Sequence, residues 1–155
     1  TSCRKARSTS TRFTPSWATS AGGKDMDTVT GGCVCGSVRI AATGQPYRVG
    51  VCHCLDCRKR QGALFHASAI FPEAAVTIAG ETRSYKGNHF CPTCGSPVFA
   101  HFDDEIGINL GAFDGLSQFR PTYELWMIRR EDWLPEFPWM RHYDRDRESA
   151  GRTED

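Results

Sequence analysis

The sequence predicts one mainly β domain. Its 155 residues fit a single domain, for which about 100 to 200 residues is usual. Short runs rich in β-branched and aromatic residues recur along the middle of the chain, separated by turn-forming residues, and no segment sustains the 3.6-residue periodicity of a long helix. The predicted strands are 37–42, 47–51, 64–71, 76–79, 82–86, 97–102, 106–110 and 123–128, with a turn or two of helix over 55–61.

The two ends of the chain differ from this middle part. Residues 1–28 are basic and rich in Ser and Thr, a composition that predicts a disordered tail. The domain is expected over 29–140, followed by a highly charged, solvated tail over 141–155. The acid-free start resembles a mitochondrial transit peptide, but Met26 precedes the first patterned segment and is an equally good start. We expect a cytoplasmic protein, or a mitochondrial one if the tail is native.

The charge balance argues against nucleic acid as a partner. The chain has 19 basic and 18 acidic residues, but five of the basic ones and none of the acids fall in residues 1–24. The body is therefore mildly acidic, whereas nucleic-acid-binding domains are usually basic. No apolar run approaches the roughly 18 residues of a membrane span. The sequence leaves the oligomeric state open.

Seven of the eight cysteines form three tight groups, and only Cys3 stands alone. Cysteines make up about 5% of the chain, below the roughly 8–10% of a secreted disulfide scaffold. Two cysteines one or two residues apart at a tight turn can direct both sulfurs to one metal ion, so the spacing favours zinc in a reducing compartment. The first and last groups predict a four-thiolate structural site of Cys33, Cys35, Cys91 and Cys94.

The central group predicts a second metal site with an open position. It supplies only Cys52, Cys54 and Cys57, and three protein ligands with a vacancy are typical of catalytic zinc. The alternative is that a histidine closes the shell and leaves both sites inert. His53 is a poor candidate because a residue between two ligands points away from their metal, whereas the other histidines stay open. The remaining candidates are His66, His89 and His101.

The charge of a three-thiolate site suggests its chemistry. Three thiolates on a dication leave a net negative centre, which is a weaker Lewis acid than zinc held by imidazoles and is suited to binding a substrate thiol. Such a thiol can attack a small aldehyde or leave from a hydroxymethyl thioether. The adjacent Arg58, Lys59 and Arg60 can offset the site's charge or hold a substrate carboxylate, or they can be a solvated helix face.

These cysteines lie in segments that resemble a known family. From Gly31 to about Trp133 the chain is similar to the glutathione-dependent formaldehyde-activating enzymes, a group that includes centromere protein V. The matching segments are GGCVCG at 31–36, CHCLDCR at 52–58 with Gln61 and Gly62, FCPTCGS at 90–96 and NLG at 109–111, with Pro121 ahead of Trp126 and Trp133. All seven clustered cysteines follow the family order and spacing.

The resemblance implies a compact zinc-bearing β-tent fold, related to Rab-exchange-factor-like domains, with two zinc ions. It implies a structural zinc on Cys33, Cys35, Cys91 and Cys94 and a catalytic zinc on Cys52, Cys54 and Cys57. The implied activity is that of a carbon–sulfur lyase similar to S-hydroxymethylglutathione synthase, with glutathione and formaldehyde as small-molecule partners. The alternative is a non-catalytic zinc-binding interaction module, as the centromeric relative suggests.

Two positions depart from the family pattern. The stretch 85–90 is shorter than the loop that usually runs there and helps to shape the substrate pocket. Glu124 lies where many relatives have His, a change expected to alter the charge near a sheet edge. Trp126 and Trp133 are expected in the core, and the acidic run at 103–105 is expected to be a turn.

Overall fold

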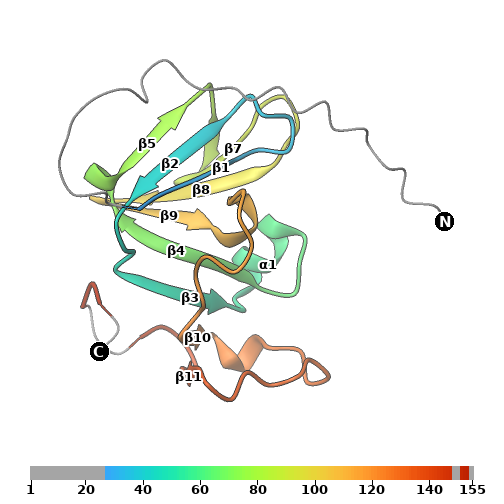
Figure 1. The fold of residues 1–155 in the computed structure, drawn as a ribbon. Helices are drawn as coiled ribbons and strands as arrows, with labels where there is room; N and C mark the ends of the chain where they lie inside the picture. Colours follow the sequence, from blue (N-terminus) through green and yellow to red (C-terminus); the bar gives the residue numbers. More distant parts are fainter. Residues whose placement is uncertain (1–26, 148–150, 154–155) are drawn as a thin grey trace.

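The fold consists of two β-sheets. A computed structural model describes residues 27–147 and 151–153, so Cys3 and nearly all of the predicted N-terminal tail lie outside the described residues. A three-stranded sheet has the order β1-β2-β5, and a larger sheet has the order β11-β10-β3-β4-β9-β8-β7-β6 (Figure 1). Neighbouring strands are antiparallel, except that β10 runs parallel to both β3 and β11. The prediction of a single mainly β domain is confirmed.

The strands mostly follow the β-rich runs of the sequence. The small sheet comprises β1 (Thr28–Gly32), β2 (Arg39–Thr43) and β5 (Val76–Ala79). The large sheet comprises β3 (Arg48–Cys52), β4 (His66–Pro72), β6 (Arg83–Tyr85), β7 (Asn88–Phe90), β8 (Pro97–Phe102), β9 (Glu105–Asn109), β10 (Tyr123–Leu125) and β11 (Arg141–His142). Short 3-10 turns follow at Glu73–Ala75, Leu110–Ala112 and Met127–Arg129.

The hydrophobic core draws on both sheets. Ile40 and Ala42 alternate along β2, and Ile106 and Ile108 alternate along β9, so each strand directs one face into the same buried cluster. Phe71 on β4 is fully buried in that cluster. Two of the clustered cysteines also belong to the core, so candidate metal ligands pack directly against the hydrophobic side chains. The core cysteines are Cys33 and Cys91.

The one α-helix of the described residues, α1 (Leu55–Gln61), connects β3 to β4. It begins at Cys54, whose sulfur accepts a hydrogen bond from the Cys57 backbone N–H at 3.4 Å, and it ends at Gly62 in a left-handed conformation. The bounds agree with the prediction for 55–61. No helix of the described residues is both long and apolar enough to cross a membrane.

The described residues after 140 are mostly exposed, as expected of a solvated tail, but part of this segment pairs with the large sheet. β11 pairs in parallel with β10, and the Tyr143 backbone N–H donates to the Glu124 carbonyl at 2.9 Å. The parallel pairing occupies an edge of β10 that would otherwise be unpaired, a tertiary effect that the charge of the segment does not reveal. The expectation that Trp133 lies in the core is wrong, because 65% of its surface is exposed. Trp126 is half-buried.

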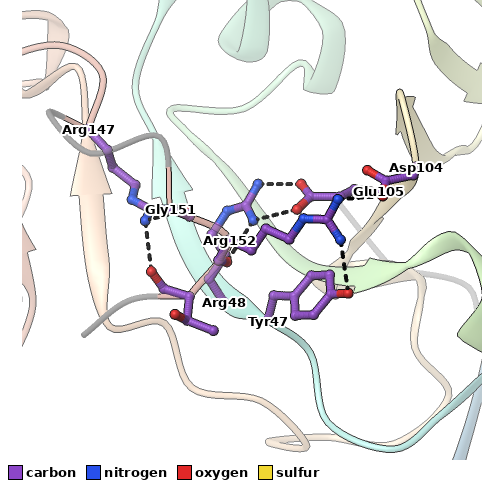
Figure 2. A network of polar contacts seen from close by, with 8 residues as sticks. Tyr47, Arg48, Asp104, Glu105, Arg147, Gly151 and Arg152 are labelled. Carbon is purple, nitrogen blue, oxygen red and sulfur yellow. Dashed lines mark hydrogen bonds and ion pairs between the residues drawn. The ribbon is translucent and has the colours of Figure 1, made fainter.

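One ion pair and a hydrogen bond hold Arg152 of the C-terminal segment against the β8–β9 turn and β3 (Figure 2). Arg48 donates to both carboxylate oxygens of Glu105, at 3.0 and 2.6 Å, and to the Arg152 carbonyl at 2.8 Å. Arg152 pairs with Asp104 and lies over the ring of Tyr47. The Arg48–Glu105 pair is mostly shielded from water, whereas the Arg152–Asp104 pair is exposed.

This difference in shielding predicts unequal effects on stability. Glu105→Ala should lower the free energy of unfolding by about 2 kcal/mol, since it leaves a mostly buried guanidinium without its bidentate partner. Arg152→Ala should have little effect, because water screens its pair with Asp104. Urea unfolding of both variants measures the difference, and equal losses would contradict the assignment.

Candidate metal centres

The first group of cysteines comes together from two distant parts of the chain. Cys33 and Cys35 follow β1, and Cys91 and Cys94 lie between β7 and β8. The four sulfurs all lie within 4.8 Å of one another. The structure therefore brings together the four residues that the sequence assigned to one site.

Matching turns direct these sulfurs inward. Gly36 follows the first pair with φ of +79°, and its N–H donates to the Cys33 carbonyl at 3.1 Å. Gly95 follows the second pair with φ of +75°, and its N–H donates to the Cys91 carbonyl at 2.9 Å. Left-handed backbone of this kind favours glycine, so the CxCG and CxxCG spacings have a structural reason.

The sulfur geometry fits a tetrahedral metal. Cys33 and Cys35 have their sulfurs 3.4 Å apart, and Cys35 and Cys91 have theirs 3.7 Å apart. Two sulfurs on a zinc ion with bonds of about 2.3 Å would lie about 3.8 Å apart, whereas a disulfide needs about 2.05 Å. Hydrogen bonding to Ser96 lowers the pKa of Cys94 to about 5 and so favours the thiolate that a metal requires.

The second group lies at the junction of β3 and α1. Cys52 ends the strand, Cys54 caps the helix, and Cys57 lies in its first turn. Their three sulfurs also lie within 4.8 Å of one another. A hydrogen bond from Cys52 lowers the pKa of Cys57 to about 4, while the same hydrogen bond raises the pKa of Cys52. The lowered pKa favours the thiolate form of Cys57, which is the form that binds a metal ion.

No histidine of the described residues completes this second group. His53 is fully buried and directs its Nε2 to Glu124 at 2.8 Å, which agrees with the expectation that it points away from the sulfurs. His89 stacks on Phe99, and His101 faces Glu73. His66 comes nearest, with Nδ1 3.9 Å from the Cys57 sulfur, but it does not lie within 4.8 Å of all three sulfurs.

Two polar side chains, His66 and Arg60, lie beside the Cys57 sulfur instead, and Asn109 holds the first of them. His66 is buried at the start of β4, and its Nε2 lies 2.7 Å from the side-chain oxygen of Asn109 on β9. That oxygen only accepts, so Nε2 carries the proton and Nδ1 presents a lone pair. Arg60 lies 3.1 Å from this Nδ1 and 3.7 Å from the Cys57 sulfur. The arrangement places an acceptor and a cation beside the three thiols.

Two cavities flank this group of polar side chains. One, of about 570 Å³, is lined by His66 and Asn109 together with Cys33 and Phe113. The other, of about 600 Å³, is lined by Arg60 and Asn109 together with the β6–β7 hairpin. Both volumes lie in the range typical of small-molecule sites. Asn109 borders both cavities, so the neighbours of the three-thiol group are accessible from two sides.

Comparison with known families identifies the chain. The sequence profile of one family, described as Glutathione-dependent formaldehyde-activating enzyme, matches residues 28–129, which is well over half of the chain. The chain belongs to this family. No curated protein matches the sequence. Family membership supports an enzyme with glutathione- and formaldehyde-related function, and the two cysteine groups, which can hold metal ions, lie within the matched region.

The three cations after Cys57 have different roles in this member of the formaldehyde-activating family. Arg58 pairs with Glu131 and donates to the Arg129 carbonyl at 2.9 Å, so it ties α1 to the C-terminal part of the domain. Lys59 is exposed and lines the larger cavity. Arg60 alone reaches the thiols.

A buried ionic cluster supports the loop that carries Cys52 and Cys54. Glu124 is fully buried and lies 2.8 Å from His53, 3.1 Å from His142 and 3.8 Å from Arg130. β3 and β11 flank Glu124 on either side, so this carboxylate lies one strand in from the edge of the large sheet and beside Arg130. No spacing pattern in the sequence indicated the cluster around Glu124 or the contact between His66 and Asn109. The family pattern included only Asn109, as the first residue of the NLG segment.

Proposed function

We propose that the chain is a zinc-dependent carbon–sulfur lyase that acts on the adduct of a glutathione-like thiol and formaldehyde. The observation that carries this proposal is a group of three convergent thiols whose neighbours His66 and Arg60 line two cavities. Among the described residues, no fourth His, Cys, Asp or Glu donor lies within 4.8 Å of all three sulfurs. Three ligands and a vacancy are typical of catalytic zinc, whereas a closed set of four is typical of structural zinc. Cys33, Cys35, Cys91 and Cys94 would hold the structural ion.

The reaction needs no oxidant or reductant. In the condensing direction the thiol sulfur forms a bond to the formaldehyde carbon, the carbonyl π bond breaks, and the proton lost by the thiol ends on the new hydroxyl oxygen. The lyase direction reverses each change. A zinc ion held by Cys52, Cys54 and Cys57 would supply the Lewis acidity that favours the thiolate form of the substrate.

The neighbouring side chains have definite tasks in this proposal. Arg60 offsets the negative charge of the three thiolates from 3.7 Å. Asn109 fixes the His66 ring so that Nδ1 accepts a hydrogen bond from Arg60 and holds this cation beside the Cys57 sulfur. The seven thiols must stay reduced to bind metal, which favours a reducing compartment such as the cytoplasm.

Exchange NMR of glutathione with formaldehyde tests the proposal. The zinc-loaded protein should speed formation of S-hydroxymethylglutathione above the spontaneous rate, and Cys54→Ala should return it to that rate. Cys3→Ala is the matched control, since Cys3 belongs to no cysteine group, and it should keep full activity. Equal rates for wild type and Cys54→Ala would overturn the assignment and favour a non-catalytic zinc module.

A further inference from the structure

The larger of the two cavities is lined by more cations than carboxylates. Its charged lining residues are Lys59 and Arg60 from α1, Lys86 from the β6–β7 turn, and a single carboxylate, Asp56. The smaller cavity has one charged lining residue, Asp114, which is paired with Arg39. A substrate that spans this region therefore meets positive charge on one side only.

Two of these cations have no carboxylate partner among the described residues. Lys59 forms no ion pair there, and Lys86 contacts only the ring of Tyr85, with Nζ 5.6 Å from the ring centre. Arg60, in contrast, is engaged by Asn88 and His66. Lys59 and Lys86 are thus available to an anionic ligand.

The backbone at Lys86 is a second, independent indication. Lys86 and Gly87 join β6 to β7 with φ of +48° and +75°, as in the two-residue hairpin turns that favour Asn-Gly. Lysine is disfavoured in left-handed backbone. The Asn88 side chain holds the turn by donating to the Tyr85 and Lys86 carbonyls, at 3.3 and 3.0 Å. The hairpin thus carries a cation where local structure prefers a small polar residue, which suggests a use for the charge.

We infer that this cavity recognises a carboxylate of an anionic thiol substrate through Lys86 and Lys59. Arg60 spans the distance from the cavity to the Cys57 sulfur, so a thiol bound at the three-thiol group can extend its backbone along Arg60 toward the two lysines. A thiol without a negative charge lacks this interaction. The inference rests on the proposed function, since it places the thiol substrate at the same site.

An NMR titration with S-methylglutathione tests recognition without catalysis, because the blocked sulfur cannot react with formaldehyde. The zinc-loaded, ¹⁵N-labelled protein should show shifts at the backbone amides of residues 85–88. Lys86→Asn should weaken binding about fivefold, as expected for the loss of one partly screened ion pair, and Lys59→Gln combined with it should weaken binding further. Arg83→Asn is the matched control, since Arg83 is a cation of the same hairpin that does not line the cavity, and it should leave binding unchanged.

Two further measurements separate recognition from structure and from catalysis. Lys86→Asn should unfold at the same temperature as wild type or a higher one, because Asn suits the turn better, so weaker binding cannot be assigned to misfolding. The diethyl ester of S-methylglutathione should bind wild type and Lys86→Asn equally. Unchanged binding of S-methylglutathione by Lys86→Asn, or no binding by wild type, would overturn the inference. Lysine-dependent binding without lyase activity would overturn the proposed function alone.

Discussion

Cys91→Ser is expected to lower the midpoint of thermal unfolding by more than about 10 °C. Cys91 is fully buried in the core, and its group joins the segment after β1 to the β7–β8 loop. A structural zinc contributes directly to folding free energy, and for a domain of this size each kcal/mol shifts the midpoint by about 2–4 °C. Thermal unfolding by circular dichroism, with zinc content by mass spectrometry, should show one zinc lost together with this drop.

Cys57→Ser is the matched control, and it should remove the other zinc with a drop of only a few degrees. The reason is the length of chain that each group closes. Cys52, Cys54 and Cys57 lie within one short segment, whereas the first group joins residues that are separated by more than half of the domain. Cross-links that close longer loops restrict the unfolded chain more. Equal drops for the two variants would contradict the proposed division into structural and catalytic sites.

Glu124→Ala should lower the free energy of unfolding by about 3–5 kcal/mol. The carboxylate is fully buried against Arg130 and two imidazoles, and its removal would leave the buried guanidinium without a compensating charge. His53 would also lose its partner, which should loosen the loop between Cys52 and Cys54 and weaken zinc retention at the second group. Denaturant unfolding and competition with a chelator measure the two effects.

Glu131→Ala provides the comparison for this prediction. Glu131 also pairs with an arginine, Arg58, but both side chains are partly exposed, so the loss should stay below about 1 kcal/mol. A loss for Glu124→Ala as small as that for Glu131→Ala would show that the buried cluster is not a structural requirement. Loss of stability without loss of zinc retention would separate the cluster from the metal-binding loop.

The sequence allowed much of the fold to be predicted because its signals are local. β5 and β8 follow the predicted runs 76–79 and 97–102, and α1 follows 55–61. β1 was missed because two of its five residues are glycine and it follows the Ser- and Thr-rich start of the chain. β7 was missed because it begins within a turn signal, and β11 was missed because its residues are charged and pair only through the edge of β10. β7 depends on the short turn that joins it to β6, and β11 depends on pairing with β10. Neither strand has a periodic pattern of its own.

The same distinction applies to the site. Cysteine spacing predicted both convergent groups, because a local turn sets each pair or triplet and the four-ligand requirement of a structural zinc joins the two distant pairs. The acceptor beside Cys57 was not predictable in that way, since it requires His66 on β4 to meet Asn109 on β9. Trp133 shows the opposite error, because a large aromatic residue was assigned to the core from its type alone and is instead exposed.

The register of the large sheet separates the residues beside the three thiols from the hairpin that lines the larger cavity. Cys52 lies opposite His66 on adjacent strands, and Asn109 lies opposite Ser68 on the next strand. The proposed reaction site therefore takes its geometry from β3, β4 and β9, three central strands of the large sheet. A shift of one residue there would turn these side chains to the other face. The β6–β7 hairpin lies at the far edge of the same sheet and can change in length or charge without moving them. Such a layout allows substrate choice to diverge among proteins while the sulfur chemistry stays the same.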